Sequence, residues 1–408
     1  MLIIRNVSLL RGQDTKPAPN RSSDSIDKPE GFGARAASQG HEILHKLVID
    51  QGRIVSLDRE GQGEPIEPPQ FDAQGLIATQ GWLDIQLNGG FGHDFTEEPT
   101  SIWDVAARLP ALGLTAFLPT IISSPLEKVQ RAIAVFEQGP PQGWKGAIPL
   151  GLHLEGPFLN PEKRGAHNPA HLRPPDPAIA KTWSRRRGVY LVTLAPELPD
   201  APETARILRE NGVIVSAGHT LADFNQALQA FNAGITCVTH LFNAQPPLNH
   251  RQPGLVGAAL QRTDIFAGII ADGIHVHPAM VEVAWKCTRD HLFLVTDAIA
   301  ALGMPEGNYT IGDYHVIVDK TGVHLPDGTL AGSNATPELC IHNLAAWTGC
   351  SITEAAKAMS EAPAAFLGLG EKGINPGAAA DLTLIDPDGK VAATIVAGEM
   401  LFDRGREA

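Results

Sequence analysis

Four polar residues of this sequence are of the types, and fall at the positions, that could do chemistry together. Glu155 in LHLEGP, His219 in SAGHT, His240 in VTHLFNA and Asp297 in LVTDA each lie at or just after the carboxyl end of a segment that predicts a β-strand. Two imidazoles and one carboxylate are a set that holds a catalytic Zn²⁺, or another borderline divalent ion, and leaves coordination positions open for water. Asp297 would then remain available as a base.

Each of these residues also has a purely structural interpretation, because polar residues often cap the ends of strands. Four of them at four different strand ends, each beside Gly, Ala, Pro or Thr, favour a shared site. His153 is the main alternative ligand, since it lies two residues before Glu155 and therefore on the same face of that strand.

Short apolar segments that alternate with helical patterns must position these residues. The segments are typical of parallel strands buried on both faces, and eight occur between residues 82 and 297. They are 82–87, 115–120, 148–155, 189–195, 213–218, 235–240, 265–272 and 292–297, with helical patterns at 102–113, 221–234 and 279–290 among those between them. Eight βα units predict an α/β protein with a (β/α)₈ TIM-like barrel, whose chemistry belongs at the carboxyl ends of the strands. A doubly wound open sheet is the alternative, although no G-x-G-x-x-G follows the first strand.

Strand-like segments also stand at both ends of the chain, at 1–10, 41–58 and 380–403, and a hairpin pattern covers 308–330. We therefore expect a small β-sandwich domain formed from 1–78 and 374–408, and a catalytic barrel over 79–373. Residues 11–40 are rich in Gly, Pro, Ser and charged residues, which predicts a mobile insertion.

Composition excludes several classes of partner. The 408 residues carry 32 Lys and Arg against 45 Asp and Glu, so the formal charge is −13, which disfavours binding to nucleic acid. No apolar window is long enough to span a membrane, and the first residues lack the features of a signal peptide, so we expect a cytoplasmic protein. The four cysteines lie far apart without a C-x-x-C pair, which argues against a disulfide framework or a thiolate metal site.

Longer motifs make a resemblance specific. GWLDIQLNGG, GLHLEGPFLNPEKRGAHNP, SAGHT, THLFNAQPPLNHRQPG, IIADGIHV, LVTDA and DGTLAGS resemble, in order and spacing from about residue 80 to 335, the N-acetylglucosamine-6-phosphate deacetylase family of the amidohydrolase superfamily. This resemblance implies hydrolysis of the acetamide of an amino-sugar phosphate, with metal ligands at Glu155, His219 and His240 and with Asp297 as both catalytic acid and base.

The resemblance also implies a set of substrate contacts and a homodimer. Arg251 in HRQPG would bind the phosphate, and in this family such an arginine can come from the neighbouring subunit. His167 would orient the acetamide or stabilise the developing oxyanion. The other implied contacts are Gln86, Ala166, Asn243, Ala244, His275, Leu330, Ala331 and Gly332.

The end of the first barrel strand bears on the number of metals. Many amidohydrolases carry His-x-His there to hold a second ion, whereas this chain has Gln86-Leu87-Asn88, and a neutral amide is a poor ligand for such a cation. We expect one divalent ion per subunit, with Zn²⁺ as the default and Fe²⁺, Co²⁺ or Mn²⁺ as alternatives. Three other functions stay open: a deacetylase of N-acetylgalactosamine 6-phosphate or of another amide, a 2-His-1-carboxylate iron oxygenase, and a non-catalytic barrel scaffold.

Overall fold

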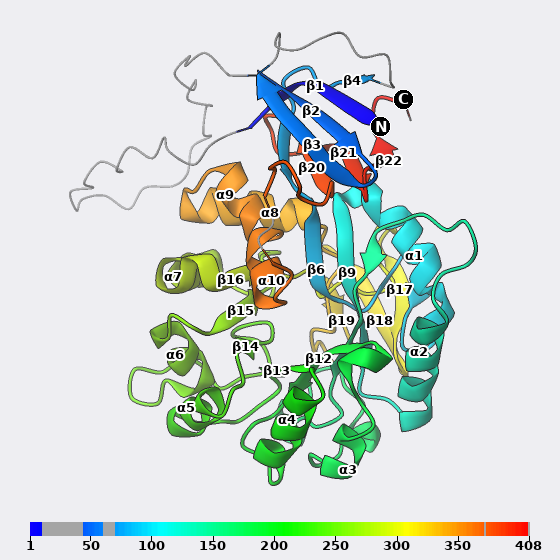
Figure 1. The fold of residues 1–408 in the computed structure, drawn as a ribbon. Coiled ribbons are helices and arrows are strands. Elements are labelled where there is room, and N and C mark those ends of the chain that lie inside the picture. Colours follow the sequence, from blue (N-terminus) through cyan, green and yellow to red (C-terminus); the bar gives the residue numbers. More distant parts are fainter. Residues whose placement is uncertain (10–43, 60–69, 371–372, 407–408) are drawn as a thin grey trace, which may run out of the picture.

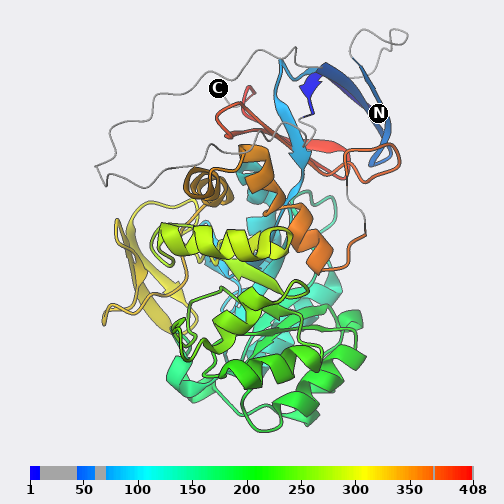
Figure 2. The same ribbon diagram turned by 90° about the vertical axis from the view of Figure 1, so that its left-hand side faces the viewer.

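The computed structural model describes residues 1–9, 44–59, 70–370 and 373–406. The predicted insertion at 11–40 lies outside these residues. Within them, no helix is both long enough and apolar enough to cross a membrane. The described chain forms a parallel barrel, a mixed sheet made from both ends of the chain, and a small third sheet beside the barrel (Figures 1 and 2).

Parallel strands form the barrel, and each overlaps one of the eight strands predicted from the sequence. Their order around the sheet follows the chain, and the ring is nearly closed by backbone bonds from Asp297 N–H to the Gln86 carbonyl (2.9 Å) and from Asn88 N–H to the Ala298 carbonyl (2.8 Å). The predicted segment 148–155 divides into β10 (Ile148–Pro149) and β11. The barrel strands are β6 (Trp82–Leu87), β9 (Leu114–Ile122), β11 (Leu152–Glu155), β12 (Val189–Leu194), β13 (Ile214–Ala217), β14 (Cys237–Val238), β15 (Phe266–Ile269) and β16 (Leu292–Leu294).

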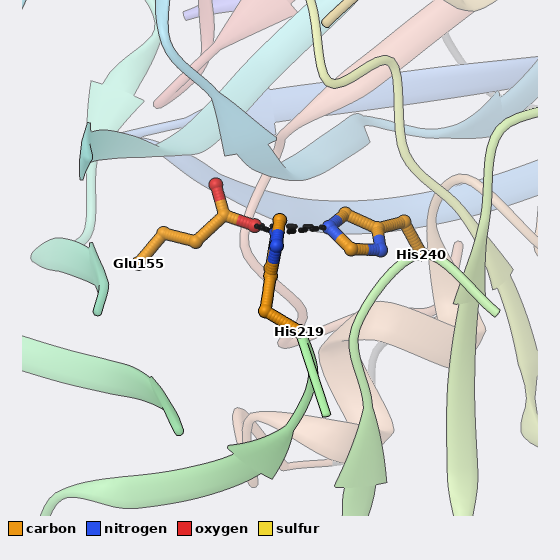
Figure 3. Close-up of side chains that lie close together, drawn as sticks. All are labelled: Glu155, His219 and His240. Carbon is orange, nitrogen blue, oxygen red and sulfur yellow. Dashed lines mark hydrogen bonds and ion pairs between the residues drawn. The ribbon is translucent and has the colours of Figure 1, made fainter. Parts of the chain in front are cut away.

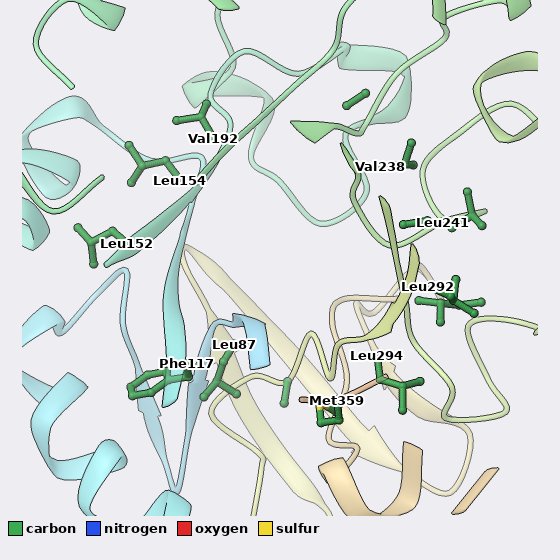
Figure 4. Close-up of a cluster of buried hydrophobic side chains, with 14 of the residues drawn as sticks. Leu87, Phe117, Leu152, Leu154, Val192, Val238, Leu241, Leu292, Leu294 and Met359 are labelled. Atoms are coloured by element: carbon green, nitrogen blue, oxygen red, sulfur yellow. The ribbon is translucent and has the colours of Figure 1, made fainter. Parts of the chain in front are cut away.

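Helices surround the barrel and pack their apolar faces against its strands. The resulting core contains Leu154, Val192 and Leu294, all of them at most 1% exposed (Figure 4). Asp223 begins α5 with a capping box, in which its side chain accepts from the Gln226 N–H. The helices are α1 (Ile102–Arg108), α2 (Leu126–Gln138), α3 (Pro177–Ala180), α4 (Ala201–Glu210), α5 (Phe224–Asn232), α6 (Gly254–Gln261), α7 (Pro278–Thr288), α8 (Pro337–Thr348), α9 (Ile352–Lys357) and α10 (Glu361–Phe366).

Strands from the two ends of the chain form one continuous mixed sheet, in the order β22-β21-β20-β5-β1-β2-β3, with β4 paired to β1. Both ends of the chain therefore contribute strands to the same sheet, at one end of the molecule (Figures 1 and 2). Its apolar face buries Ile4, Leu47, Leu382 and Ile395. The strands are β1 (Leu2–Ser8), β2 (Leu44–Asp50), β3 (Arg53–Arg59), β4 (Gln70–Asp72), β5 (Ile77–Gln80), β20 (Leu382–Ile385), β21 (Val391–Val396) and β22 (Glu399–Asp403).

The hairpin predicted at 308–330 forms the third sheet, with strands β17 (Gly307–Ile311), β18 (Tyr314–Asp319) and β19 (Gly322–His324). Ile311 and Val316 pack in a cluster with Ile122 at the end of β9. The turn between β17 and β18 is hydrogen-bonded to the short strand pair β7 (Gly89–Gly90) and β8 (His93–Asp94). The Gly312 N–H in this turn donates to Asp94 Oδ2 (2.7 Å). This sheet therefore forms a wall beside the carboxyl ends of the barrel strands.

Candidate metal centre and active site

Three of the four residues singled out at strand ends leave their strands in an unusual backbone conformation. His219, His240 and Asp297 have φ values of +48°, +30° and +51°. Non-glycine residues adopt this left-handed region at a cost of about 1–3 kcal/mol, and such strain concentrates at functional sites. Glu155, at the end of β11, turns its carboxylate toward the two imidazoles (Figure 3).

Glu155, His219 and His240 form a buried group whose ligand atoms all lie within 4.8 Å of one another. Glu155 Oε1 lies 3.2 Å from His219 Nε2 and 3.0 Å from His240 Nε2, and the two Nε2 atoms are 3.0 Å apart (Figure 3). The Lys163 carbonyl oxygen accepts from His219 Nδ1 at 2.8 Å. This bond places the proton of a neutral His219 on Nδ1, so that its Nε2 lone pair faces the other two ligand atoms.

These donor atoms fit a divalent metal ion. Neutral imidazole nitrogens and a carboxylate oxygen are the ligand types that Zn²⁺ and related ions take, and a carbonyl partner on the far nitrogen of a ligand histidine is the usual outer support. In addition, the Gln86 amide donates to Glu155 Oε1 (2.9 Å) and fixes its orientation. The group could therefore hold one ion.

Asp297 lies beside this group and is 9% exposed. Burial, followed by the negative charge of Glu155, raises the pKa of the Asp297 carboxyl to about 7. A cation held by Glu155 and its two histidines would offset that repulsion. Asn88 donates from Nδ2 to Asp297 Oδ1 at 2.7 Å, which leaves Oδ2 without a hydrogen-bond donor among the described residues.

His167 presents a hydrogen-bond donor to the same place. Its Nδ1 accepts from the Ser123 backbone N–H at 3.2 Å and lies 2.9 Å from the Ser123 hydroxyl oxygen. An N–H can only donate, so the proton of the neutral ring is on Nε2, which lies 3.8 Å from Glu155 Oε2. Burial, with the nearby His219, lowers the pKa of His167 to about 3, so the ring is held neutral with Nε2–H as a donor.

A cavity of about 350 Å³ opens over these residues, a size that suits a small organic ligand. The wall formed by the third sheet and the segment after it contributes Ile311, Thr329, Leu330 and Gly332. The remaining lining residues are Asn88, Ile122, Glu155, Glu162, Lys163, Gly165, Ala166, His167, His219, His240, Asn243, Ala244, Ile270, His275 and Asp297.

Comparison with known proteins identifies the family of this chain. The amidohydrolase family model matches residues 117–401. An N-acetylglucosamine-6-phosphate deacetylase from Bos taurus is 42% identical over 385 residues, which are 89% of this chain and 93% of that protein. The chain belongs to the N-acetylglucosamine-6-phosphate deacetylase family of the amidohydrolases.

Solved structures of this deacetylase family share the fold. The Thermotoga maritima enzyme matches with a TM-score of 0.78 and 33% identity, over 89% of this chain and 96% of that one. A Mycobacterium smegmatis deacetylase, an Asp-to-Ala variant in complex with N-acetyl-D-glucosamine-6-phosphate, matches with a TM-score of 0.80 and 31% identity, over 88% and 94% of the two chains.

Most of the substrate contacts that the resemblance to this deacetylase family implies lie on the cavity wall, and three do not. Arg251 is exposed and outside the lining, Ala331 is fully buried in the cluster behind the wall, and Gln86 lies beneath Glu155. The implied contacts that line the cavity are Ala166, His167, Asn243, Ala244, His275, Leu330 and Gly332. His275 donates from Nδ1 to Asp272 Oδ2 (2.7 Å), which leaves Nε2 for the cavity.

His153, the alternative ligand of the sequence analysis, does not belong to the metal-binding group. Its ring lies between two hydroxyls, with Nε2 2.8 Å from Thr193 Oγ1 and Nδ1 3.4 Å from Thr120 Oγ1. It is fully buried, and burial lowers its pKa to about 4. His153 is therefore a neutral core histidine with partners of its own.

Asn88 and Lys163 are two of the cavity residues that the sequence analysis did not predict. The sequence analysis considered Asn88 only as a possible metal ligand, although its position two residues after Gln86 on one strand face places both amides at the site. Lys163 stands inside the quoted motif GLHLEGPFLNPEKRGAHNP, but nothing in the spacing separates it from the adjacent Arg164. Only the structure shows that Lys163 reaches the cavity, whereas the Arg164 guanidinium donates to the Gly165 and His167 carbonyls.

Proposed function

We propose that this chain hydrolyses the acetamide of N-acetyl-D-glucosamine 6-phosphate to glucosamine 6-phosphate and acetate. The observation that carries the proposal is the buried Glu155, His219 and His240 group with Asp297 on the same cavity, in a chain 42% identical to a deacetylase of that name. The non-catalytic scaffold and the oxygenase have no comparable support.

Glu155, His219 and His240 would hold one divalent ion per subunit, with Zn²⁺ as the default and Fe²⁺, Co²⁺ or Mn²⁺ as alternatives. When bound, such an ion supplies a Lewis acid for the acetamide carbonyl and acidifies a water molecule. Gln86 would keep Glu155 oriented through its 2.9 Å bond.

Asp297 would act as general base and then as general acid. It accepts a proton from the attacking water as the new C–O bond forms, and it delivers that proton to the nitrogen as the C–N bond breaks. Its Oδ2 is the atom for this transfer, because Asn88 occupies Oδ1. His167, with its proton on Nε2, would donate to the carbonyl oxygen as negative charge develops there.

The other end of the cavity would bind the sugar phosphate. Asn243, Ala244 and His275 would contribute donors there, and Ala166 and the segment Leu330 to Gly332 would contact the sugar. Arg251 is exposed and outside the cavity of its own subunit, which fits the proposal that it acts across the interface of a homodimer. Sedimentation of Arg251→Ala tests the homodimer. Its KM for phosphorylated and unphosphorylated N-acetylglucosamine tests the contact between Arg251 and the phosphate.

Acetate release from a panel of N-acetylated sugars tests the function. We expect turnover of N-acetylglucosamine 6-phosphate to exceed that of N-acetylgalactosamine 6-phosphate and of unphosphorylated N-acetylglucosamine. Asp297→Asn should keep its metal and lose turnover. A preparation that contains metal but releases no acetate from the glucosamine derivative would refute the proposal, and preference for the galactose epimer would reassign the substrate.

A further inference from the structure

The segment from His240 to Gln245 has a backbone suited to an anion. His240, Phe242 and Ala244 all have positive φ, at +30°, +80° and +52°. Residues that alternate in this way turn successive N–H groups toward one side and form a concave nest for negative charge. The N–H groups of Ala244 and Gln245 donate no hydrogen bond within the described residues, and Ala244 lines the cavity.

The Lys163 ammonium lies against this segment. Its Nζ donates to the Gln245 carbonyl oxygen at 3.1 Å, immediately beyond Ala244. An ammonium has three protons, so two further donors remain. Lys163 forms no ion pair with any described carboxylate, and it is the one lysine or arginine that lines the described cavity. An unpaired cation beside free N–H groups is a site for a compact anion.

We propose that Lys163 binds the phosphate of the substrate and thereby sets the preference for phosphorylated sugars, a role that rests on the proposed function. The protein has a formal charge of −13, and Glu162 also lines the cavity. Binding of a dianionic phosphate at the Lys163 end of the cavity therefore requires a positive charge close to it. Arg251 would reach the phosphate only from a second subunit. Lys163 supplies its charge within the same chain.

The backbone and the side chain of Lys163 have separate partners. The carbonyl oxygen accepts from His219 Nδ1 (2.8 Å), whereas the ammonium donates to the Gln245 carbonyl. A change of side chain leaves the carbonyl in place, and the turn Pro161–Lys163 is capped independently by the Asn160 side chain, which accepts from the Glu162 N–H. Loss of the ammonium should therefore weaken phosphate recognition without loss of the metal.

Lys163→Met keeps most of the length of the side chain and removes its charge. We expect kcat/KM for N-acetylglucosamine 6-phosphate to fall about tenfold to a hundredfold, mainly through KM, as for the loss of a hydrogen bond to a charged group. Activity on unphosphorylated N-acetylglucosamine and the metal content should stay unchanged. Lys145→Met is the matched control, because Lys145 is 62% exposed and pairs with Glu399, and its loss changes the net charge equally.

Calorimetry with glucosamine 6-phosphate and glucosamine separates this inference from the proposed function, because it needs no turnover. We expect the unmodified protein to prefer the phosphorylated sugar and Lys163→Met to lose most of that preference, with Lys163→Arg retaining part of it. Equal binding by Lys163→Met and the unmodified protein, or equal losses with both sugars, would overturn the role of Lys163. Absence of acetate release from the unmodified protein would instead refute the proposed function, whatever the binding result.

Discussion

The hydrogen bond from Asn88 to Asp297 gives the sharpest prediction for catalysis. Asn88 is 3% exposed, and its amide is the one hydrogen-bond donor to the Asp297 side chain among the described residues. Asn88→Ala should leave the proposed base free to rotate and deprive its charged form of a 2.7 Å bond. A hydrogen bond to a charged group contributes about 1.5–3 kcal/mol, and 1.4 kcal/mol is a factor of ten in rate. We expect kcat to fall about 10- to 150-fold.

The same substitution should move the acidic limb of the pH profile. Burial and Glu155 raise the pKa of Asp297, and the bond from Asn88 opposes that rise. Its loss raises the pKa further, so a base that must be ionised loses activity at a higher pH than in the unmodified protein. Acetate release measured between pH 5 and 9 gives both kcat and this limb.

Asn211→Ala is the matched control for Asn88→Ala. Asn211 also donates a side-chain hydrogen bond, to the Trp183 carbonyl at 2.9 Å, but it follows α4 away from the cavity. It should lower the free energy of unfolding without an effect on kcat. If Asn88→Ala retains activity within about threefold of the unmodified protein with an unshifted limb, Asn88 does not position the base.

Three further variants test the supports of the site and the fold. Gln86→Leu removes the donor to Glu155 Oε1 and should weaken metal retention about 10- to 100-fold in competition with a chelator; an unchanged affinity would contradict this support. Leu154→Ala, at a position 1% exposed, should lower the free energy of unfolding by about 2–5 kcal/mol in urea, and a loss below about 1 kcal/mol would argue against tight packing there. Burial raises the pKa of Asp94 to about 6 from 3.8, so between these pH values the folded protein keeps a proton that the unfolded chain has released. The stability of the unmodified protein should therefore fall by about 3 kcal/mol, relative to Asp94→Asn, as pH rises from about 4 to 6, and parallel stability curves would show that Asp94 does not titrate in this way.

The barrel could be predicted because each strand is an apolar segment separated from the next by a helix. Glu155, His219 and His240 could then be placed together, since parallel strands bring their carboxyl ends to one side. The two-residue β14, Cys237–Val238, shows the limit of the approach, because the predicted strand 235–240 continued through His240, whereas the chain has already left the sheet there.

The parts of the cavity that could not be predicted depend on loop geometry, which leaves no periodic pattern in the sequence. Leu330 and Gly332 line the cavity, whereas Ala331 between them faces the cluster with Ile311. Lys163 and Arg164 are adjacent basic residues, and only the path of the turn that follows β11 separates a cavity ammonium from a guanidinium bonded to the backbone. No sequence pattern distinguishes such neighbours.

Equilibrium dialysis with elemental analysis tests the central claim most directly. We expect close to one divalent ion per chain in the unmodified protein, and loss of that ion in Glu155→Ala, His219→Ala and His240→Ala. His153→Ala, which removes the neighbouring core histidine, should retain it. Full metal content in any of the first three variants, or loss only in His153→Ala, would contradict the assignment of the metal to Glu155, His219 and His240.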